Sequence, residues 1–124
     1  MSFDWSEYLN LANSLGASAT NPPINEAELR SAISRAYYAN YCLARNHLKD
    51  KEGLPIPRTD AHKFVIDQFR NSSDRARKDL GKDLDRLKNY RLIADYENTY
   101  AGIGPTTRVA LALASQVINK LKSL

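Results

Sequence analysis

Hydrophobic side chains recur every three or four positions along most of the chain. This spacing places them on one face of an α-helix, whereas a half-buried strand alternates apolar and polar residues. The pattern predicts helices over about residues 2–16, 25–51, 60–70, 75–96 and 105–121, and no stretch alternates long enough to predict a strand. We therefore expect an all-α fold, an up-and-down bundle of four main helices plus one short helix.

Polar and small residues mark where these helices begin and end. Four short polar side chains can cap the helices that start at them, namely Ser2, Asn25, Asp60 and Asp74. Gly53, followed by two prolines, ends the second helix, and Gly81 predicts a break or kink near the start of the fourth. Without a repeat or a long linker, the whole chain, residues 1–124, is expected to form one domain.

Composition narrows the class of protein. Hydrophobic residues make up 43% of the chain and charged residues 26%, which is typical of a globular protein. No apolar run approaches the roughly 20 residues that cross a membrane. Cys42 is the single cysteine, so an internal disulfide is excluded and a reducing compartment is favoured. We expect a cytoplasmic protein with no membrane segment.

The basic residues are concentrated in the later part of the sequence. Residues 1–34 carry four acidic side chains and one basic, a balance of −3, whereas residues 35–124 carry 17 basic and 10 acidic, a balance of +7. Such a basic region suggests an anionic partner, with RNA or DNA the usual candidates. Lysine and arginine on a solvated helix surface would give the same count.

Two arginines occupy positions where periodicity predicts burial. Arg91 falls within the apolar face of the fourth helix, which comprises Leu80, Leu84, Leu87, Arg91 and Ala94. Arg35 falls in a strip of small residues on the second helix, with Ser31, Ala32, Ala39 and Cys42. A buried guanidinium must be paired or lie at an interface. The small-residue strip predicts a close contact, for which a second copy of the chain is a candidate.

Arg91 allows two interpretations from its neighbours. Asp95 lies four residues further on, so the two side chains can meet on one helix face. The pair could fix helix packing. Alternatively, Arg91 could be held to meet a phosphate while Tyr96 beside it stacks on a base, which would make this a binding site.

Motifs of the common enzyme classes are absent. The sequence contains no glycine-rich phosphate loop, no G-x-S-x-G and no H-E-x-x-H, and its cysteine and histidines lack metal-ligand spacing. We therefore expect neither a metal nor a cofactor. His47 suits a cation at a helix end. His62, in the first turn of its helix, could be a neutral hydrogen-bonded imidazole, a nucleic-acid contact or a general base.

Three segments together resemble the HEPN (higher eukaryotes and prokaryotes nucleotide-binding) superfamily, in its stand-alone prokaryotic form. They are SAISRAYYANYCLARNHL (31–48), AHKFVIDQF (61–69) and LDRLKNYRLIADYE (84–97). The resemblance covers almost the whole chain and implies an all-α homodimer that binds RNA or nucleotides. It also implies a place among toxin–antitoxin or defence proteins, where many members are metal-independent ribonucleases and some pair with a minimal nucleotidyltransferase.

The ribonuclease motif of that family is incomplete here. It consists of an arginine and a later histidine with four to six residues between them. Arg91 matches the arginine, but the window for the histidine holds Tyr96, Glu97 and Asn98. Because histidine is the group that exchanges protons near neutral pH, the resemblance supports binding more than cleavage. The catalytic residues stay unassigned, with Arg91, His62 and Tyr96 as candidates.

Three functions are therefore open. The first is an RNA- or nucleotide-binding protein whose site contains Arg35, Tyr38, Arg91, Asp95 and Tyr96. The second is a ribonuclease of the same fold that uses a displaced histidine. The third is a protein-interaction module that pairs with a nucleotidyltransferase, in which the arginines serve packing alone.

Overall fold

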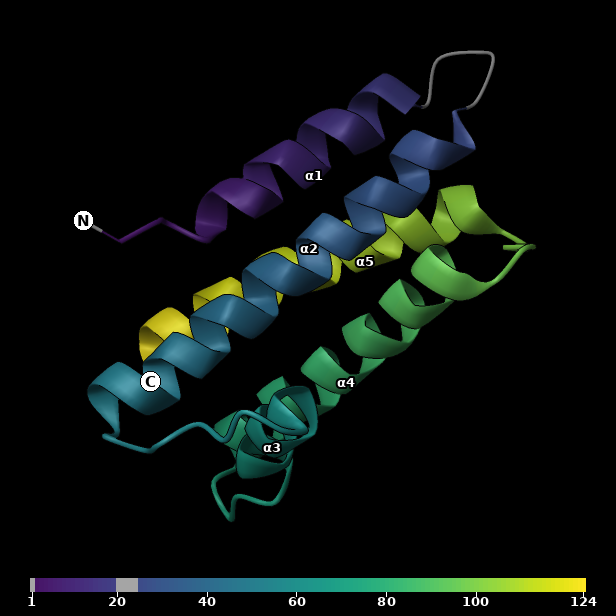
Figure 1. The fold of residues 1–124 in the computed structure, drawn as a ribbon. Helices are drawn as coiled ribbons and strands as arrows, with labels where there is room; N and C mark the ends of the chain where they lie inside the picture. Colours follow the sequence, from purple (N-terminus) through teal and green to yellow (C-terminus); the bar gives the residue numbers. More distant parts are fainter. Residues whose placement is uncertain (1, 20–24) are drawn as a thin grey trace.

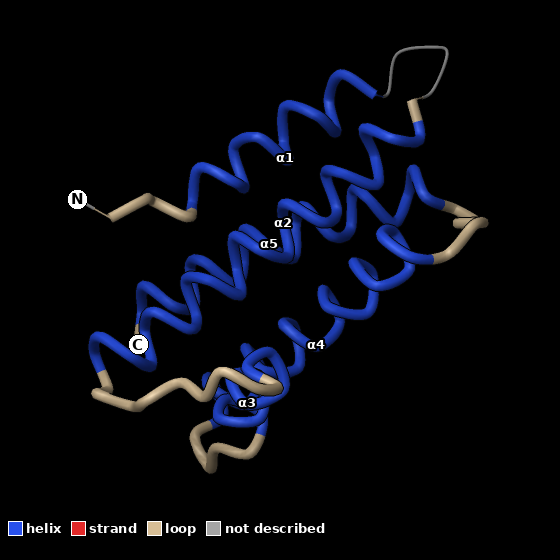
Figure 2. Tube along the Cα trace, in the orientation of Figure 1, coloured by secondary structure: helices blue, strands red, loops and turns tan. Residues whose placement is uncertain are grey.

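The computed structural model describes residues 2–19 and 25–124, and the described part is helical without strands (Figures 1 and 2). Its elements, in chain order, are α1 (Ser6–Ala19), α2 (Glu26–Asn46), a π-helix (His47–Lys51), α3 (Ala61–Arg70), α4 (Arg75–Tyr96) and α5 (Ile103–Ser123). The expected all-α bundle of four long helices and one short helix is confirmed. No described helix is long and apolar enough to cross a membrane.

The four long helices run up and down along one common direction, and α2 lies at the centre (Figure 1). α1 and α4 both pack against α2, and α5 contacts α1, α2 and α4. The short helix α3 lies beside the start of α4 at one end of the bundle. This arrangement leaves one face of α2 between α1 on one side and the α3–α4 pair on the other.

The predicted apolar faces are the buried ones. On α4, the structure buries Leu80, Leu84, Leu87, Arg91 and Ala94, and on α2 it buries the face that includes Ile33, Tyr37 and Leu48. The last helix differs by one position, because Val109 is 45% exposed and Ala110 is buried instead. Helical periodicity therefore located the core along nearly the whole chain.

The first helix begins and ends later than expected. Asp4, and not Ser2, caps it, because the Asp4 carboxylate accepts a hydrogen bond from the backbone N–H of Ser6 at 3.0 Å. The sequence suggested that the first helix ends at Gly16, but helix α1 continues to Ala19. A glycine inside a helix lowers its stability without ending it.

Two of the other predicted caps form, and one does not. Asn25 accepts from the N–H of Glu28 at 3.1 Å, and Asp74 accepts from the N–H of Arg77 at 3.0 Å. Asp60 does precede α3, but its backbone is left-handed, with φ of 54°, and its side chain makes no capping hydrogen bond. That side chain lies at the edge of the groove described below.

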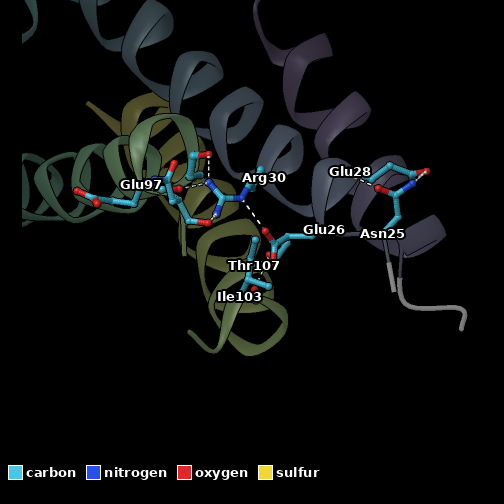
Figure 3. A network of polar contacts seen from close by, with 9 residues as sticks. Asn25, Glu26, Glu28, Arg30, Glu97, Ile103 and Thr107 are labelled. Atoms are coloured by element: carbon cyan, nitrogen blue, oxygen red, sulfur yellow. Dashed lines mark hydrogen bonds and ion pairs between the residues drawn. The ribbon is translucent and has the colours of Figure 1, made fainter. Parts of the chain in front are cut away.

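An arginine that the sequence did not single out ties α2 to the end of α4 (Figure 3). Arg30 donates hydrogen bonds to the backbone carbonyls of Ala94 at 2.9 Å, Glu97 at 2.7 Å and Asn98 at 3.4 Å. Its Nε pairs with the carboxylate of Glu26 at 3.0 Å. Because the last carbonyls of a helix lack intrahelical partners, Arg30 caps α4 from a neighbouring helix.

The small-residue strip of α2 is used inside the chain. Ala32 and Ala39 are fully buried and Cys42 is 4% exposed, while α1 packs along the same helix. Only Ser31 of the strip is exposed. The strip therefore permits close packing within one bundle, and it does not offer a free face to a second copy.

Gly81 does not break α4, which is continuous from Arg75 to Tyr96. It instead allows α3 to come close, because a Cβ at this position would lie 2.4 Å from the backbone nitrogen of Arg70. No atom lies within 4 Å of an equivalent Cβ at Gly104, near the start of α5. Gly81 is therefore needed for the packing of α3 against α4, whereas Gly104 affects only its own helix.

Gly81→Ala should destabilise the protein by about 1–3 kcal/mol, because the added methyl group forces α3 away from α4. Helix propensity alone predicts the opposite sign, a gain of about 1 kcal/mol. Urea unfolding followed by circular dichroism measures the difference. Gly104→Ala, the matched control, should be neutral or stabilising. A stabilised Gly81→Ala protein would contradict this close helix–helix contact.

Candidate functional site

An open groove of about 810 Å³ lies on the face of α2 between α1 and the start of α3. Aromatic and basic side chains make up most of its lining. The rings belong to Trp5, Tyr8, Tyr38, Tyr41 and His62, and the cations belong to Arg35, Arg45, Arg58, Lys63 and Lys88. Asp60 is the one carboxylate among the described lining residues. The groove therefore combines a positive charge with ring surfaces, as sites for single-stranded nucleic acids do.

Arg35 is held between two tyrosines on the floor of the groove. Its guanidinium carbon lies 5.0 Å from the ring centroid of Tyr8 on α1 and 5.7 Å from that of Tyr38 on α2. Both distances fall within the range of cation–π attraction. The two rings face the guanidinium and do not accept hydrogen bonds from its N–H groups. The N–H groups of Arg35 can therefore bind an anion.

Arg45 repeats this arrangement ten residues later on the same helix. Its guanidinium carbon lies 5.6 Å from the ring centroid of Trp5 and 5.9 Å from that of Tyr41. Its Nε donates to the side chain of Asn46 at 3.1 Å. Spacings of three and four residues place Arg35, Tyr38, Tyr41 and Arg45 on the groove face of α2.

These two arginines differ from the other half-buried arginines of the chain in what balances their charge. Arg30 pairs with Glu26, and Arg77 pairs with Glu52. Within the described residues, neither Arg35 nor Arg45 has a carboxylate within ion-pair distance. Their charge is therefore balanced by rings, and it stays available to an anionic ligand.

His62 is fixed at the edge of the groove by two tyrosines. Its Nδ1 lies 2.6 Å from the hydroxyl of Tyr37, and its ring stacks on Tyr41 at 3.8 Å with an interplanar angle of 4°. Burial, together with the charges of Arg91, Lys88 and Arg45, lowers the pKa of His62 below its ordinary value. The imidazole is therefore neutral near pH 7.

The state of Tyr37 decides which nitrogen of His62 carries the proton. Burial raises the pKa of Tyr37, so its hydroxyl keeps its proton. Because a phenol is a better hydrogen-bond donor than an imidazole N–H, and an imidazole nitrogen a better acceptor than a phenol oxygen, we infer that the hydroxyl donates to Nδ1. A neutral imidazole that accepts at Nδ1 carries its hydrogen on Nε2. Within the described residues Nε2 has no hydrogen-bond partner, so this N–H can donate to a ligand. A protonated Nε2 has no lone pair with which to act as a general base.

Arg91 lies behind the groove. Its side chain is 8% exposed, and its guanidinium carbon sits 5.2 Å from the ring centroid of Tyr37 and 5.4 Å from that of Tyr38. The expected approach to Asp95 is present, with 3.7 Å between the nearest nitrogen and oxygen. Its Nε is buried without a hydrogen-bond partner. Asp95 also accepts from the hydroxyl of Ser34 at 3.3 Å.

The five binding residues that the sequence suggested do not all lie together. Arg35 and Tyr38 line the groove, while Arg91 is buried behind Tyr37 and Tyr38, and Asp95, an exposed residue, does not line the groove. Tyr96 is 71% exposed and is not among the lining residues. The structure thus brings two of the five to the groove itself and adds His62 to them.

Several residues of the groove were missed by sequence reasoning. Trp5 and Tyr8 fall within the helix predicted over residues 2–16 and were not singled out, yet both are half-buried and contact arginines of α2. The spacing of these residues could have indicated the contact, because Trp5 and Tyr8 are three residues apart and can face Arg35 and Arg45 on the neighbouring helix. Arg58 lies in a loop, where periodicity gives no information.

The other reactive side chains offer little chemistry. Cys42 also lines the groove, but burial raises the pKa of its thiol, so the reactive thiolate is disfavoured. His47 lies outside the groove, with its Nε2 3.0 Å from the carboxylate of Glu52. The described residues contain no cluster of three or more histidine, cysteine or acidic side chains that could hold a metal.

Comparison with known proteins finds no matching family model, no matching curated protein and no matching solved structure.

NMR of the imidazole nitrogens should show His62 as the Nε2–H tautomer, with a pKa below 6.5. At a pH where the imidazole is neutral, Tyr37→Phe should remove the preference for the Nε2–H tautomer, because Nδ1 then loses its hydrogen-bond donor. His47 in the same spectra serves as the internal control, since it has no tyrosine partner in the structure. An Nδ1–H tautomer of His62 in the unaltered protein would contradict the donor role and restore the general base as a possibility.

Proposed function

We propose that the protein is an HEPN-like, RNA- or nucleotide-binding protein and that the groove on α2 is its binding site. The observation that supports this most is the contact of Arg35 and Arg45 with aromatic rings, with no carboxylate partner for either among the residues that the structure describes. Rings stack on nucleobases of any sequence, and arginine N–H groups bind phosphate oxygens in pairs. Both kinds of contact are offered within one groove.

The charge of the lining residues favours a phosphate-bearing ligand. Five basic side chains line the groove against the single carboxylate of Asp60, and His62 is neutral. Aromatic and arginine side chains are also enriched at protein–protein interfaces, where lysine is depleted, so the excess of positive charge, with its two lysines, is what favours a polyanion here. The groove therefore supports the binding hypothesis over the interaction module.

The arrangement of His62 favours binding over cleavage. With Tyr37 donating to Nδ1, the histidine presents a hydrogen-bond donor and no base. The ribonuclease hypothesis needs a group that removes a proton from the ribose hydroxyl. Neither Tyr37, whose pKa is raised, nor Cys42 meets this need.

The remaining parts of the proposal rest on the family resemblance alone. They are a homodimer, a role in a toxin–antitoxin or defence system, and a minimal nucleotidyltransferase as the protein partner. A cytoplasmic location is proposed from the single cysteine of the sequence. The buried small-residue strip removes the sequence-based reason to place the dimer contact on α2. Light scattering would establish the oligomeric state directly.

Arg35→Gln should weaken binding of a single-stranded oligouridylate by about tenfold, since a charge-assisted hydrogen bond contributes roughly 1.5–3 kcal/mol. The slope of affinity against salt should fall by about one unit, because one phosphate contact is removed. Fluorescence anisotropy over a range of salt concentrations measures both quantities.

Arg108→Gln is the matched control, since Arg108 is exposed on α5 and does not line the groove. Its affinity and its salt slope should equal those of the unaltered protein. Equal losses for the two variants would show that binding depends on overall charge and not on the groove. Absence of binding by the unaltered protein would overturn the proposed function.

A further inference from the structure

The two banks of the groove differ in chemistry. Trp5 and the start of α1 form one bank and carry aromatic rings without a charge, whereas the loop before α3, the first turn of α3 and α4 form the other bank and carry three cations, with the His62 ring stacked on Tyr41. We propose that this difference fixes the orientation of the ligand, with unpaired bases against the α1 bank and phosphates against the α3–α4 bank. This inference rests on the proposed function and specifies how the same groove is used.

The α1 bank presents two rings to the groove, Trp5 and Tyr8, and Phe3 packs against both of them from outside the lining. Phe3, Trp5 and Tyr8 meet edge to face, with centroid distances of 4.9 Å, 5.5 Å and 5.3 Å. Phe3 is 49% exposed, and Trp5 and Tyr8 are half-buried. No charged side chain of α1 lines the groove. The exposed surface of this bank therefore suits the face of a base better than a phosphate.

The opposite bank is basic. Arg58 comes from the loop, Lys63 from α3 and Lys88 from α4. Lys63 pairs with Asp67 at 2.7 Å, while Arg58 and Lys88 have no acidic partner within the described residues. These three cations outnumber the Asp60 carboxylate on the same bank. None of their side chains adds a ring, so this bank suits the phosphate backbone.

The floor of the groove fits a strand that lies across it. Arg35 and Arg45 reach the floor between the two banks, so a phosphate on the basic side remains near their N–H groups. A base can contact the ring bank only if its face is not already stacked in a duplex. The expected ligand is therefore an unpaired strand, and a duplex of the same sequence should bind less tightly.

Two strands of equal length separate the roles of the banks. One is an oligouridylate, and the other has the same ribose-phosphate backbone without bases. Trp5→Leu should reduce the preference for the base-bearing strand by about tenfold, because one stacking surface is lost. Lys88→Gln should weaken both strands by the same factor and lower the salt slope by about one unit. The preference of the Lys88→Gln protein for the base-bearing strand should equal that of the unaltered protein.

Matched controls lie outside the groove. Tyr96→Leu removes an exposed ring from α4, and Lys82→Gln removes an exposed cation from the same helix. Both should leave affinity and preference unchanged. If Trp5→Leu loses helical circular dichroism, Tyr8→Leu tests the same bank, because Tyr8 also lines the groove.

The possible failures are distinct. If the unaltered protein binds neither strand, the proposed function fails. If it binds both strands equally, or if Trp5→Leu leaves the preference intact, binding stands and the assigned orientation is overturned. A variant at Lys88 that affects only the base-bearing strand would likewise contradict the assignment of phosphate to that bank.

Discussion

The groove depends on the burial of one charged group, the guanidinium of Arg91, between α4 and α2. A permanently charged side chain loses its hydration when it is buried, and this cost must be offset inside the protein. Here the ring faces of Tyr37 and Tyr38, together with the Asp95 carboxylate, provide the compensation. Because Arg91 is attracted to both rings, it holds two neighbouring tyrosines of α2 in place from behind.

Each of these tyrosines then positions a residue of the groove. Tyr37 shares a hydrogen bond with Nδ1 of His62, in which we infer that the hydroxyl donates, and Tyr38 contacts the guanidinium of Arg35. The positive charge of Arg91 also helps to keep His62 neutral, since it lowers the pKa of the imidazole. One buried interaction thus links the packing of the bundle to the chemistry of its surface. The resulting groove offers donors, cations and rings, which is a set suited to binding and not to proton abstraction.

The sequence predicted what depends on local spacing. It located the helices, their buried faces, the burial of Arg91 and its approach to Asp95, because each follows from residues three or four apart on one helix. It also placed His62 at the start of α3. It assigned Tyr96 to the binding site from its nearness to Arg91 along the chain, whereas the structure leaves this residue outside the groove.

The sequence could not predict contacts between helices. The rings that balance Arg35 and Arg91 lie wholly or partly on other helices, and their identity depends on how α1 and α4 pack against α2. The basic bank was missed for the same reason, because Arg58 and Lys88 are thirty residues apart and meet only in the folded chain. Periodicity identifies the face that a side chain occupies, and packing decides what that side chain meets.

The salt dependence of oligouridylate binding by the double variant Arg91→Met, Asp95→Leu tests this account most directly. Removing both charges avoids leaving a carboxylate unpaired. If Arg91 acts from behind by holding Tyr37 and Tyr38, the protein should stay folded and bind more weakly, with an unchanged salt slope. A salt slope lower by about one unit would mean that Arg91 contacts a phosphate itself. Unchanged affinity would mean that the buried guanidinium does not organise the groove.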